Sequence, residues 1–341
     1  MTFRKFTFAA AVTFGLFLTC DAAQAQQTGR VYRVGALFNG SPNRGAPGSV
    51  QGQVEFDALK EELARRGYVE GTNVIFEARF ADGQMDRFPG LAAELVALGV
   101  DVIASYGGPP TNAAQKATRT IPIVAALVAD PVALGFAATL DRPGGNVTGI
   151  TNHDPQLATR QLDILRAMFP KLARVAFLSD ADIPGADASG LAPIERSNVA
   201  AAAAIGITPQ MLKVRGPRPD FDPAFKAMVT EKAEVLVVLE VPVPFSHRQR
   251  IAELAAAHRM PTMFWGGASN AGGLMSYGTS FTDTYSRMPL FVDRILKGAK
   301  PRDMPFEVIS RREFVINLKT ARMLGLTIPA RLLKQADRVI D

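Results

Sequence analysis

Small and hydroxylated residues follow three apolar runs in the first half of the chain, Val31 to Phe38, Val100 to Ser105 and Ile121 to Leu127. These residues are Asn39 and Ser41 after the first run, Tyr106, Gly107, Gly108 and Thr111 after the second, and Asp130 after the third. Backbone N–H groups at the start of a helix, together with hydroxyl groups, can hold a carboxylate. We therefore interpret these residues as ligand-binding, with turns and helix caps as the alternative.

Acidic and aromatic residues take the corresponding places in the second half. Asp180, Glu240 and Trp265 lie at the ends of predicted strands, and Tyr277 follows later. Acids on one side and N–H or hydroxyl groups on the other suit a zwitterionic ligand, and Tyr106, Trp265 and Tyr277 would give it apolar or cation–π walls. The alternative is that the acids cap helices and Trp265 packs in the core.

Signatures of phosphate binding, zinc hydrolysis and nucleophilic catalysis are absent from the sequence. The patterns G-x-G-x-x-G, Walker A, H-E-x-x-H and G-x-S-x-G do not occur. Asp180-Ala181-Asp182 resembles a fragment of a calcium loop but lacks the spaced bidentate Glu. The three histidines, His153, His247 and His258, are interpreted as surface or capping residues. We predict no catalytic residue, no metal site and no cofactor, and hence a protein that is not an enzyme.

The elements that must position these residues alternate between strand and helix. Gln53 to Arg66 carries apolar residues at helical spacing between two predicted strands, Val31 to Phe38 and Asn73 to Phe80. A cluster of turn residues, 141–146, precedes a second series of the same kind. The sequence therefore predicts an α/β protein with two tandem units, each a doubly wound parallel sheet.

The first 25 residues have the pattern of a secretory signal peptide. Arg4 and Lys5 precede the apolar run Phe6 to Leu18, and Ala23-Gln24-Ala25 offers a cleavage site. We expect cleavage after Ala25 and export to the periplasm. The alternative is lipidation at Cys20, although Thr19 is an unusual residue before a lipidated cysteine. Cleavage would remove that cysteine, the only one in the chain, and so exclude disulfides and thiolate chemistry.

Composition narrows the class of partner. The formal net charge is +6, with the basic residues scattered rather than gathered into a stripe, so nucleic-acid binding is not expected. No later apolar run approaches the roughly 20 residues of a membrane-spanning helix. We expect a monomer that binds a small molecule.

Several stretches resemble one known family, the ABC transporter substrate-binding proteins that include tryptophan and aromatic amino-acid binders. They are Ile121-Pro122-Ile123-Val124, Asp130-Pro131-Val132, Arg142-Pro143-Gly144-Gly145-Asn146-Val147-Thr148-Gly149, Gly272-Gly273-Leu274-Met275-Ser276-Tyr277-Gly278, Ile295-Leu296-Lys297-Gly298-Ala299-Lys300-Pro301, Asn317-Leu318-Lys319-Thr320-Ala321 and Gly325-Leu326-Thr327-Ile328-Pro329. The resemblance implies the type I periplasmic-binding-protein fold, two lobes joined by a hinge of three crossovers. It places residues 30–150 with 278–308 in lobe 1, and residues 151–277 with 309–341 in lobe 2.

The resemblance also implies a function. The protein would capture a small organic solute, an amino acid or an aromatic carboxylate, and deliver it to an ABC permease in the inner membrane. A ligand-sensing domain that partners a membrane receptor is the alternative, and an exported hydrolase is a third reading. Hinge motion would link solute binding to lobe closure.

Overall fold

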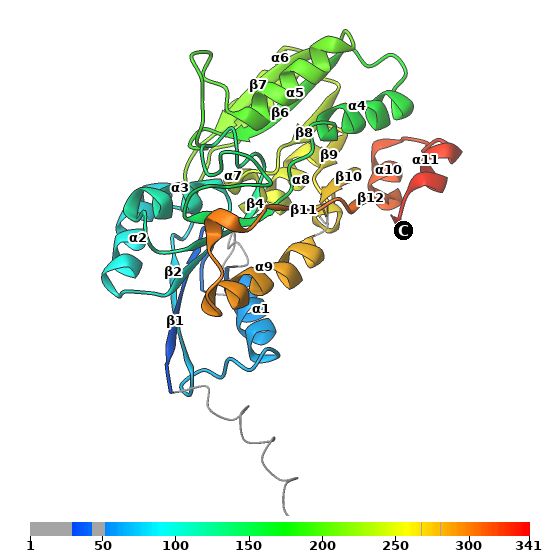
Figure 1. The fold of residues 1–341 in the computed structure, drawn as a ribbon. Coiled ribbons are helices and arrows are strands. Elements are labelled where there is room, and N and C mark those ends of the chain that lie inside the picture. Colours follow the sequence, from blue (N-terminus) through cyan, green and yellow to red (C-terminus); the bar gives the residue numbers. More distant parts are fainter. Residues whose placement is uncertain (1–28, 43–51, 267, 280) are drawn as a thin grey trace, which may run out of the picture.

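Two separate β-sheets organise the chain, and their strands confirm the predicted α/β class. The computed structural model describes residues 29–42, 52–266, 268–279 and 281–341, so the predicted signal peptide and Cys20 lie outside the described residues. Figure 1 shows the elements of the first sheet below those of the second. Within these described ranges, no helix combines the length and the apolar character needed to cross a membrane.

The first sheet has six parallel strands in the order β11-β5-β4-β3-β1-β2. The strands are β1 (Tyr32–Phe38), β2 (Val74–Phe80), β3 (Val102–Tyr106), β4 (Ile123–Val128), β5 (Val147–Thr151) and β11 (Glu307–Val308). The helices beside it are α1 (Gly52–Ala64), α2 (Phe88–Ala97), α3 (Gly108–Ala117) and α9 (Phe281–Leu296), with short 3₁₀ helices η1 (Met85–Arg87) and η3 (Pro301–Asp303). The central strands are continuous apolar sequences because helices cover both faces of the sheet.

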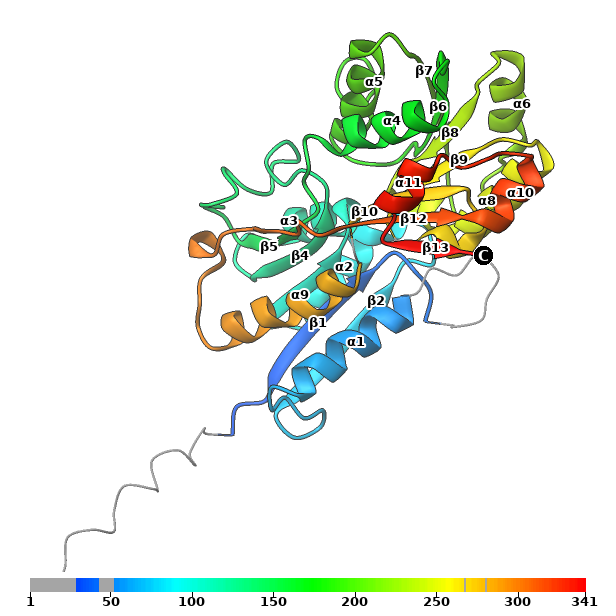
Figure 2. The ribbon, with the colours of Figure 1, turned by 90° about the vertical axis from the view of Figure 1, so that its right-hand side faces the viewer.

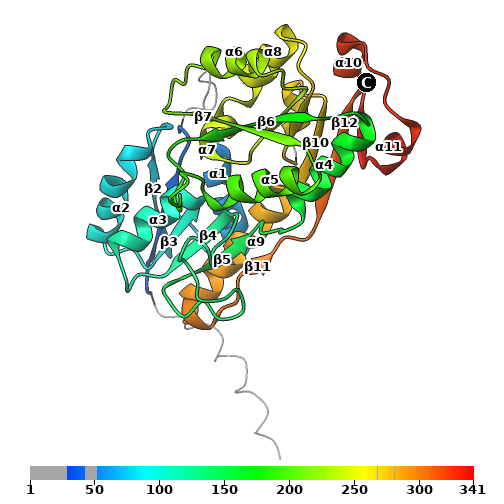
Figure 3. The ribbon, with the colours of Figure 1, turned by 90° about the horizontal axis from the view of Figure 1, so that it is seen from above.

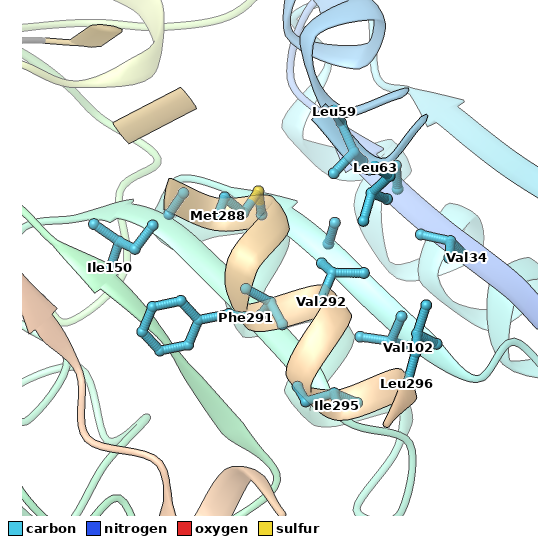
Figure 4. Packing of buried hydrophobic residues seen from close by; sticks show 14 of the residues in the cluster. Val34, Leu59, Leu63, Val102, Ile150, Met288, Phe291, Val292, Ile295 and Leu296 are labelled. Carbon is cyan, nitrogen blue, oxygen red and sulfur yellow. The ribbon is translucent and has the colours of Figure 1, made fainter. Parts of the chain in front are cut away.

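Helix α9 returns to the first sheet from far along the chain. Its side chains Met288, Phe291, Val292 and Ile295 pack with α1 and with the central strands in one buried cluster, shown in Figure 4. Helices α2 and α3 pack on the opposite face of the same sheet. The first core therefore includes a helix that follows most of the second sheet's strands in the sequence.

The second sheet has seven strands in the order β13-β12-β10-β9-β8-β6-β7, parallel except for the pair β10 and β12. The strands are β6 (Arg174–Asp180), β7 (Thr208–Val214), β8 (Val235–Val238), β9 (Thr262–Phe264), β10 (Met275–Thr279), β12 (Arg312–Asn317) and β13 (Arg338–Ile340). Its helices are α4 (Leu157–Met168), α5 (Pro193–Ala204), α6 (Asp222–Thr230), α7 (Pro242–Ser246), α8 (Arg248–Ala257), α10 (Leu318–Leu324) and α11 (Ala330–Gln335), with the 3₁₀ helix η2 (Ala268–Ala271). Figure 3 shows α4 and α5 on one face of this sheet and α6 and α8 on the other.

Three crossings connect the two sheets. They lie between β5 and α4, between β10 and α9, and between β11 and β12. Figure 2 shows the last of these as an extended segment that runs from one group of elements to the other. This is the connectivity expected of the type I fold.

Gly149 and Gly278 lie close to the first two crossings, but neither is part of a crossing segment. Both lie inside strands, Gly149 in β5 and Gly278 in β10. A Cβ on Gly149 would lie 1.9 Å from the carbonyl oxygen of Ala125, and one on Gly278 would lie 2.6 Å from the backbone nitrogen of Gly266. Close backbone packing, rather than freedom to rotate, requires glycine at these two places.

We predict that Gly149→Ala destabilises the protein by about 3 kcal/mol or more, because the new methyl group meets backbone that cannot move aside. Gly149 also has φ +143°, which an alanine rarely adopts. Denaturant unfolding checks this, with Gly145→Ala as the control because a Cβ on Gly145 would meet no atom within 4 Å. Equal stability of the two variants would contradict the close approach.

Candidate ligand-binding cleft

Three cavities lie between the two groups of elements, and Glu240 lines all of them. Their volumes, measured out to their open mouths, are about 510, 670 and 430 Å³. Glu240 comes two residues after β8, at the carboxyl end of a central strand of the second sheet. Ligands of open α/β sheets bind at such strand ends. The cavities therefore meet at the place where this fold class positions a ligand.

The first cavity, called here the aromatic cavity, takes residues from both sides. It is lined by Asn39, Glu55, Tyr106, Gly107, Leu127, Glu240, Val241, Pro242 and Phe245. The first five belong to α1 or to the ends of β1, β3 and β4, and the last four belong to the segment after β8. A molecule in this cavity would touch both sheets' elements at once.

The other two cavities extend from Glu240 in different directions. The hinge cavity is lined by Ala129, Asp130, Asn152, His153, Asp154, Pro155, Leu157, Ala158, Gln161, Pro193, Ile194, Ser197, Asn198, Val238, Leu239, Glu240 and Trp265. The rim cavity is lined by Gly108, Pro109, Leu127, Ala129, Asp130, Leu134, Ile183, Pro184, Ala192, Pro193, Ile194, Glu240 and Val241. None of the described residues that line the three cavities is lysine or arginine.

Burial makes the Glu240 carboxyl group a weaker acid than an exposed glutamate. Loss of hydration raises its pKa from 4.5 to about 7, although the Asn152 amide and the charge of Arg312 both lower it. Neither carboxylate oxygen is exposed, and neither has a partner at normal hydrogen-bond geometry among the described residues. An ionised carboxylate in that setting destabilises the folded protein unless another group pairs with it.

Four more buried polar atoms around the cleft lack partners within the part of the chain that the structure describes. They are Asn39 Oδ1 in the aromatic cavity, and Asn152 Oδ1, Asn198 Oδ1 and Trp265 Nε1 in the hinge cavity. Each of these side chains is at most 9% exposed. Native proteins leave few buried polar atoms unpaired, so their concentration here indicates a site that a polar ligand completes.

A buried ion pair joins two of the crossings beside this cleft. Arg312 Nε donates to Asp154 Oδ2 at 3.1 Å, and the two side chains are 8% and 11% exposed. Asp154 follows β5 and lines the hinge cavity, while Arg312 begins β12. The pairing explains why Arg312 does not neutralise Glu240, since Asp154 already satisfies much of its charge.

Seven of the residues singled out from the sequence line the three cavities: Asn39, Tyr106, Gly107, Gly108, Asp130, Glu240 and Trp265. Trp265 is 1% exposed and stacks on Phe245 with ring centroids 5.5 Å apart, so it is both a core residue and part of the wall. Ser41, Thr111, Asp180 and Tyr277 line none of the three.

Local contacts account for the positions of the residues that line none of the three cavities. Thr111 Oγ1 donates to the Gly107 carbonyl at 2.7 Å. The two carboxylate oxygens of fully buried Asp180 accept from the backbone N–H groups of Asp182 and Val243, while burial raises its pKa. Tyr277 packs edge-on against Phe314 within the second core. Ser41 lies at the end of a described range and is half-buried.

Backbone donors at the expected carboxylate site are fewer than the sequence suggested. Pro109 and Pro110 have no N–H group, and the N–H of Thr111 donates to the Gly107 carbonyl. Asp130 Oδ1 accepts from the N–H groups of Val132 and Ala133, so that turn caps itself. The start of α3 therefore offers little to an anion beyond the N–H of Gly108.

Sequence reasoning missed eight polar or aromatic lining residues: Glu55, Asn152, His153, Asp154, Gln161, Ser197, Asn198 and Phe245. Asn152 follows β5, so its place at a predicted strand end was an available signal. Glu55, Asn198 and Phe245 lie on helices, and only the tertiary fold brings them to the cleft.

At the cleft mouth, Gly83 and Gly108 on the first-sheet side lie close to Pro217 and Pro184 on the second-sheet side. A Cβ on Gly83 would lie 3.3 Å from Cβ of Pro217, and one on Gly108 would lie 3.6 Å from Cγ of Pro184. Glycine at these positions lets the loops of the first sheet come close to the loops of the second. The arrangement described here is therefore one in which the two sides touch.

Comparison with known proteins agrees with this architecture. The family model described as "ABC transporter substrate binding protein" matches residues 52–340. A tyrosine-binding protein of Clostridioides difficile (strain R20291) is 34% identical over 91 residues, which is 27% of this chain and 26% of that protein. This chain thus matches about a quarter of the length of that curated relative.

Two solved structures are similar over nearly the whole fold. A conserved domain protein from Vibrio cholerae has a TM-score of 0.80 at 24% identity, over 91% of this chain and 100% of that one. An ABC domain from Streptococcus pneumoniae in complex with L-Trp has a TM-score of 0.77 at 25% identity, with the same coverage.

We predict that Glu240→Gln stabilises the ligand-free protein at pH 8 and not at pH 4. The folded-state pKa is raised to about 7, so wild-type stability is highest when the group is protonated and falls as the pH rises from about 4.5 through 7. At pH 8 the variant should gain about 2 to 3 kcal/mol. Thermal unfolding across this pH range checks the prediction, with exposed Glu231→Gln as the control. Equal melting temperatures at pH 8 would contradict an unpaired buried carboxylate.

Proposed function

This chain belongs to the family of ABC transporter substrate-binding proteins, and from that premise we propose that it captures a small organic solute between two lobes and delivers it to a membrane permease for import. The family binds solutes, is not enzymatic, and works in the periplasm or outside the cell. We further propose that this chain is exported to the periplasm with cleavage after Ala25, and that it acts as a monomer.

The position of Glu240 supports this proposal more than any other observation. A buried carboxylate whose oxygens have no partner at normal hydrogen-bond geometry among the described residues lines cavities to which both sheets contribute residues. Such a group is destabilising in the empty protein, so its retention calls for a ligand that compensates it. A solute that contacts Glu240 and the first-sheet residues together stabilises the closed arrangement over an open one.

The lobes of this mechanism follow the strand membership of the two sheets. We propose that residues 29–151 with 281–308 form lobe 1, and that residues 152–279 with 309–341 form lobe 2. This proposal ends the middle segment of lobe 2 at Thr279 rather than Tyr277, because all five residues of β10 pair with β12.

An amino acid fits this cleft better than a simple carboxylate does. The carboxylates of Glu55, Asp130 and Glu240 line the cavities together with the aromatic rings of Tyr106 and Phe245. The relatives from C. difficile and S. pneumoniae bind tyrosine and tryptophan by their names. We therefore propose an aromatic amino acid or a related amine as the solute.

Native mass spectrometry of freshly purified protein, followed by denaturation, tests the function directly. We expect a stoichiometric small organic molecule, and calorimetric titration of the emptied protein with L-tryptophan, L-tyrosine and benzoate then compares the candidate classes. We expect Glu240→Gln to weaken an amine-bearing solute about ten- to a hundredfold, as loss of one buried charge-assisted hydrogen bond would. Absence of any bound or titratable solute would contradict the proposal.

Closure can be tested separately by placing a bulky side chain between the lobes. Gly108→Leu adds a side chain where even a Cβ would lie 3.6 Å from Pro184, so we expect the variant to remain open when solute is added. Gly90→Leu is the matched control, because Gly90 is exposed on α2 and a Cβ there meets nothing within 4 Å.

Small-angle scattering measures the outcome as the radius of gyration with and without solute. Wild type and the Gly90→Leu control should contract on binding, while Gly108→Leu should not. A wild type that keeps one radius at saturation would contradict lobe closure.

A further inference from the structure

The hinge cavity, the largest of the three at about 670 Å³, has more unpartnered acceptors than donors. Asn152, Asn198 and Trp265 are 7%, 6% and 1% exposed, and each has one polar atom without a partner among the described residues. The same holds for both Glu240 oxygens at normal hydrogen-bond geometry. Four acceptor atoms and one donor atom, Trp265 Nε1, are therefore unpartnered in this lining within the described chain.

Other polar side chains of the hinge cavity already have partners. Ser197 and Gln161 each donate to a backbone carbonyl group, at 3.0 and 2.8 Å. His153 Nδ1 lies 3.1 Å from the Ala129 carbonyl oxygen, and Asp154 accepts from Arg312. The described lining therefore leaves the four acceptors to a molecule that enters the cavity.

The orientations of the two asparagine amides follow from their donor contacts. Asn198 Nδ2 donates to the carbonyl group of Ile194, one turn earlier on α5, at 2.8 Å. The Asn152 amide acts on Glu240 as a hydrogen-bond donor and lowers the pKa of that carboxyl group. A flip of either amide would lose its donor contact, so in both residues the oxygen is the atom left for a ligand.

A primary ammonium group meets the requirements of this lining. It has three N–H donors and no acceptor, and its positive charge would compensate the buried Glu240 carboxylate. No lysine or arginine is among the described residues of the hinge cavity. On the other side of Glu240, the aromatic cavity offers the rings of Tyr106 and Phe245 to an apolar body.

We propose that the hinge cavity is the subsite for the solute's ammonium group, which binds Glu240 and the amide oxygens of Asn152 and Asn198, while the apolar part of the solute occupies the aromatic cavity. This inference rests on the proposed solute-binding function and adds the orientation of the solute. Asn198 becomes a specificity-determining residue. All three acceptors belong to the proposed lobe 2, so recognition of the ammonium group is a property of that lobe.

Pairs of probes that differ only in the charged end test the charge preference. Tryptamine and tyramine carry the amine, while indole-3-propionate and 3-(4-hydroxyphenyl)propionate carry a carboxylate on the same rings. Calorimetric titration of the wild type should show binding of at least one amine, with about tenfold or weaker affinity for its acid. Preference for the acids, or no binding of either class, would overturn the proposal.

Two matched substitutions locate the ammonium group in one cavity or the other. Asn198→Leu removes an acceptor from the hinge cavity, and we expect it to lower the ratio of amine to acid affinity about tenfold. Asn39→Leu removes an unpartnered amide oxygen from the aromatic cavity and should leave that ratio unchanged. Ser197→Ala is the control on α5, because its exposed hydroxyl group already donates to the Pro193 carbonyl. A ratio that falls in Asn39→Leu and not in Asn198→Leu would place the ammonium group in the aromatic cavity and overturn the proposal.

The wild-type protein gives a readout that no folding defect can affect. Trp265 is the only tryptophan of the chain, so its indole N–H group gives a single nuclear magnetic resonance signal. It lines the hinge cavity and not the aromatic cavity. In the tyramine complex we expect nuclear Overhauser contacts from this N–H to the methylene groups beside the ammonium group. Contacts to the phenol ring alone, or none, would contradict the proposed orientation.

The outcomes separate a failure of the subsite from a failure of the proposed function. If a solute co-purifies but the amine probes do not bind, or bind in the opposite orientation, the solute-binding function stands and the subsite is wrong. If no solute co-purifies and no probe binds, both are wrong.

Discussion

The proposed function depends on one interaction that the protein leaves incomplete. The oxygens of the buried Glu240 carboxylate have no partner at normal hydrogen-bond geometry among the described residues. Its pKa is raised to about 7 because burial removes water, and Arg312, the cation that bears on it, is already paired with Asp154. The fold accepts a destabilising group at the meeting point of three cavities. A binding protein gains from such a cost, because the energy recovered when a ligand compensates the group appears as affinity.

In the proposed mechanism, the architecture around Glu240 would couple the compensation of this carboxylate to lobe closure. The strand ends of the two sheets supply opposite walls of the aromatic cavity, and glycine and proline let their loops touch at the mouth. The Arg312–Asp154 pair joins two of the three crossings and also lies within electrostatic reach of Glu240. In the proposed mechanism, ionisation of Glu240 on solute binding would also act on this ion pair at the crossings.

Sequence predicted the fold well because it is set by local patterns, such as the apolar run at Val235–Val238 and the helical spacing in α1. It also singled out Glu240, which comes two residues after a buried strand and lines all three cavities. Asp180 has the same kind of position, but its carboxylate caps Val243, a partner 63 residues away that no local pattern reveals. Glu55 could not be found either, because a buried acid on a helix resembles a surface acid until the opposite lobe is in place.

Proton release on solute binding tests the central claim most directly. Titration of the protein with tryptamine at pH 7, in buffers of different ionisation enthalpy, counts the protons that leave as the complex forms. If an ammonium group pairs with Glu240, the carboxyl group changes from half protonated to ionised, and about half a proton should be released for each amine bound. The same titration on Glu240→Gln should release none. Amine binding to the wild type without proton release would contradict the claim that Glu240 is the unpaired group that receives the solute.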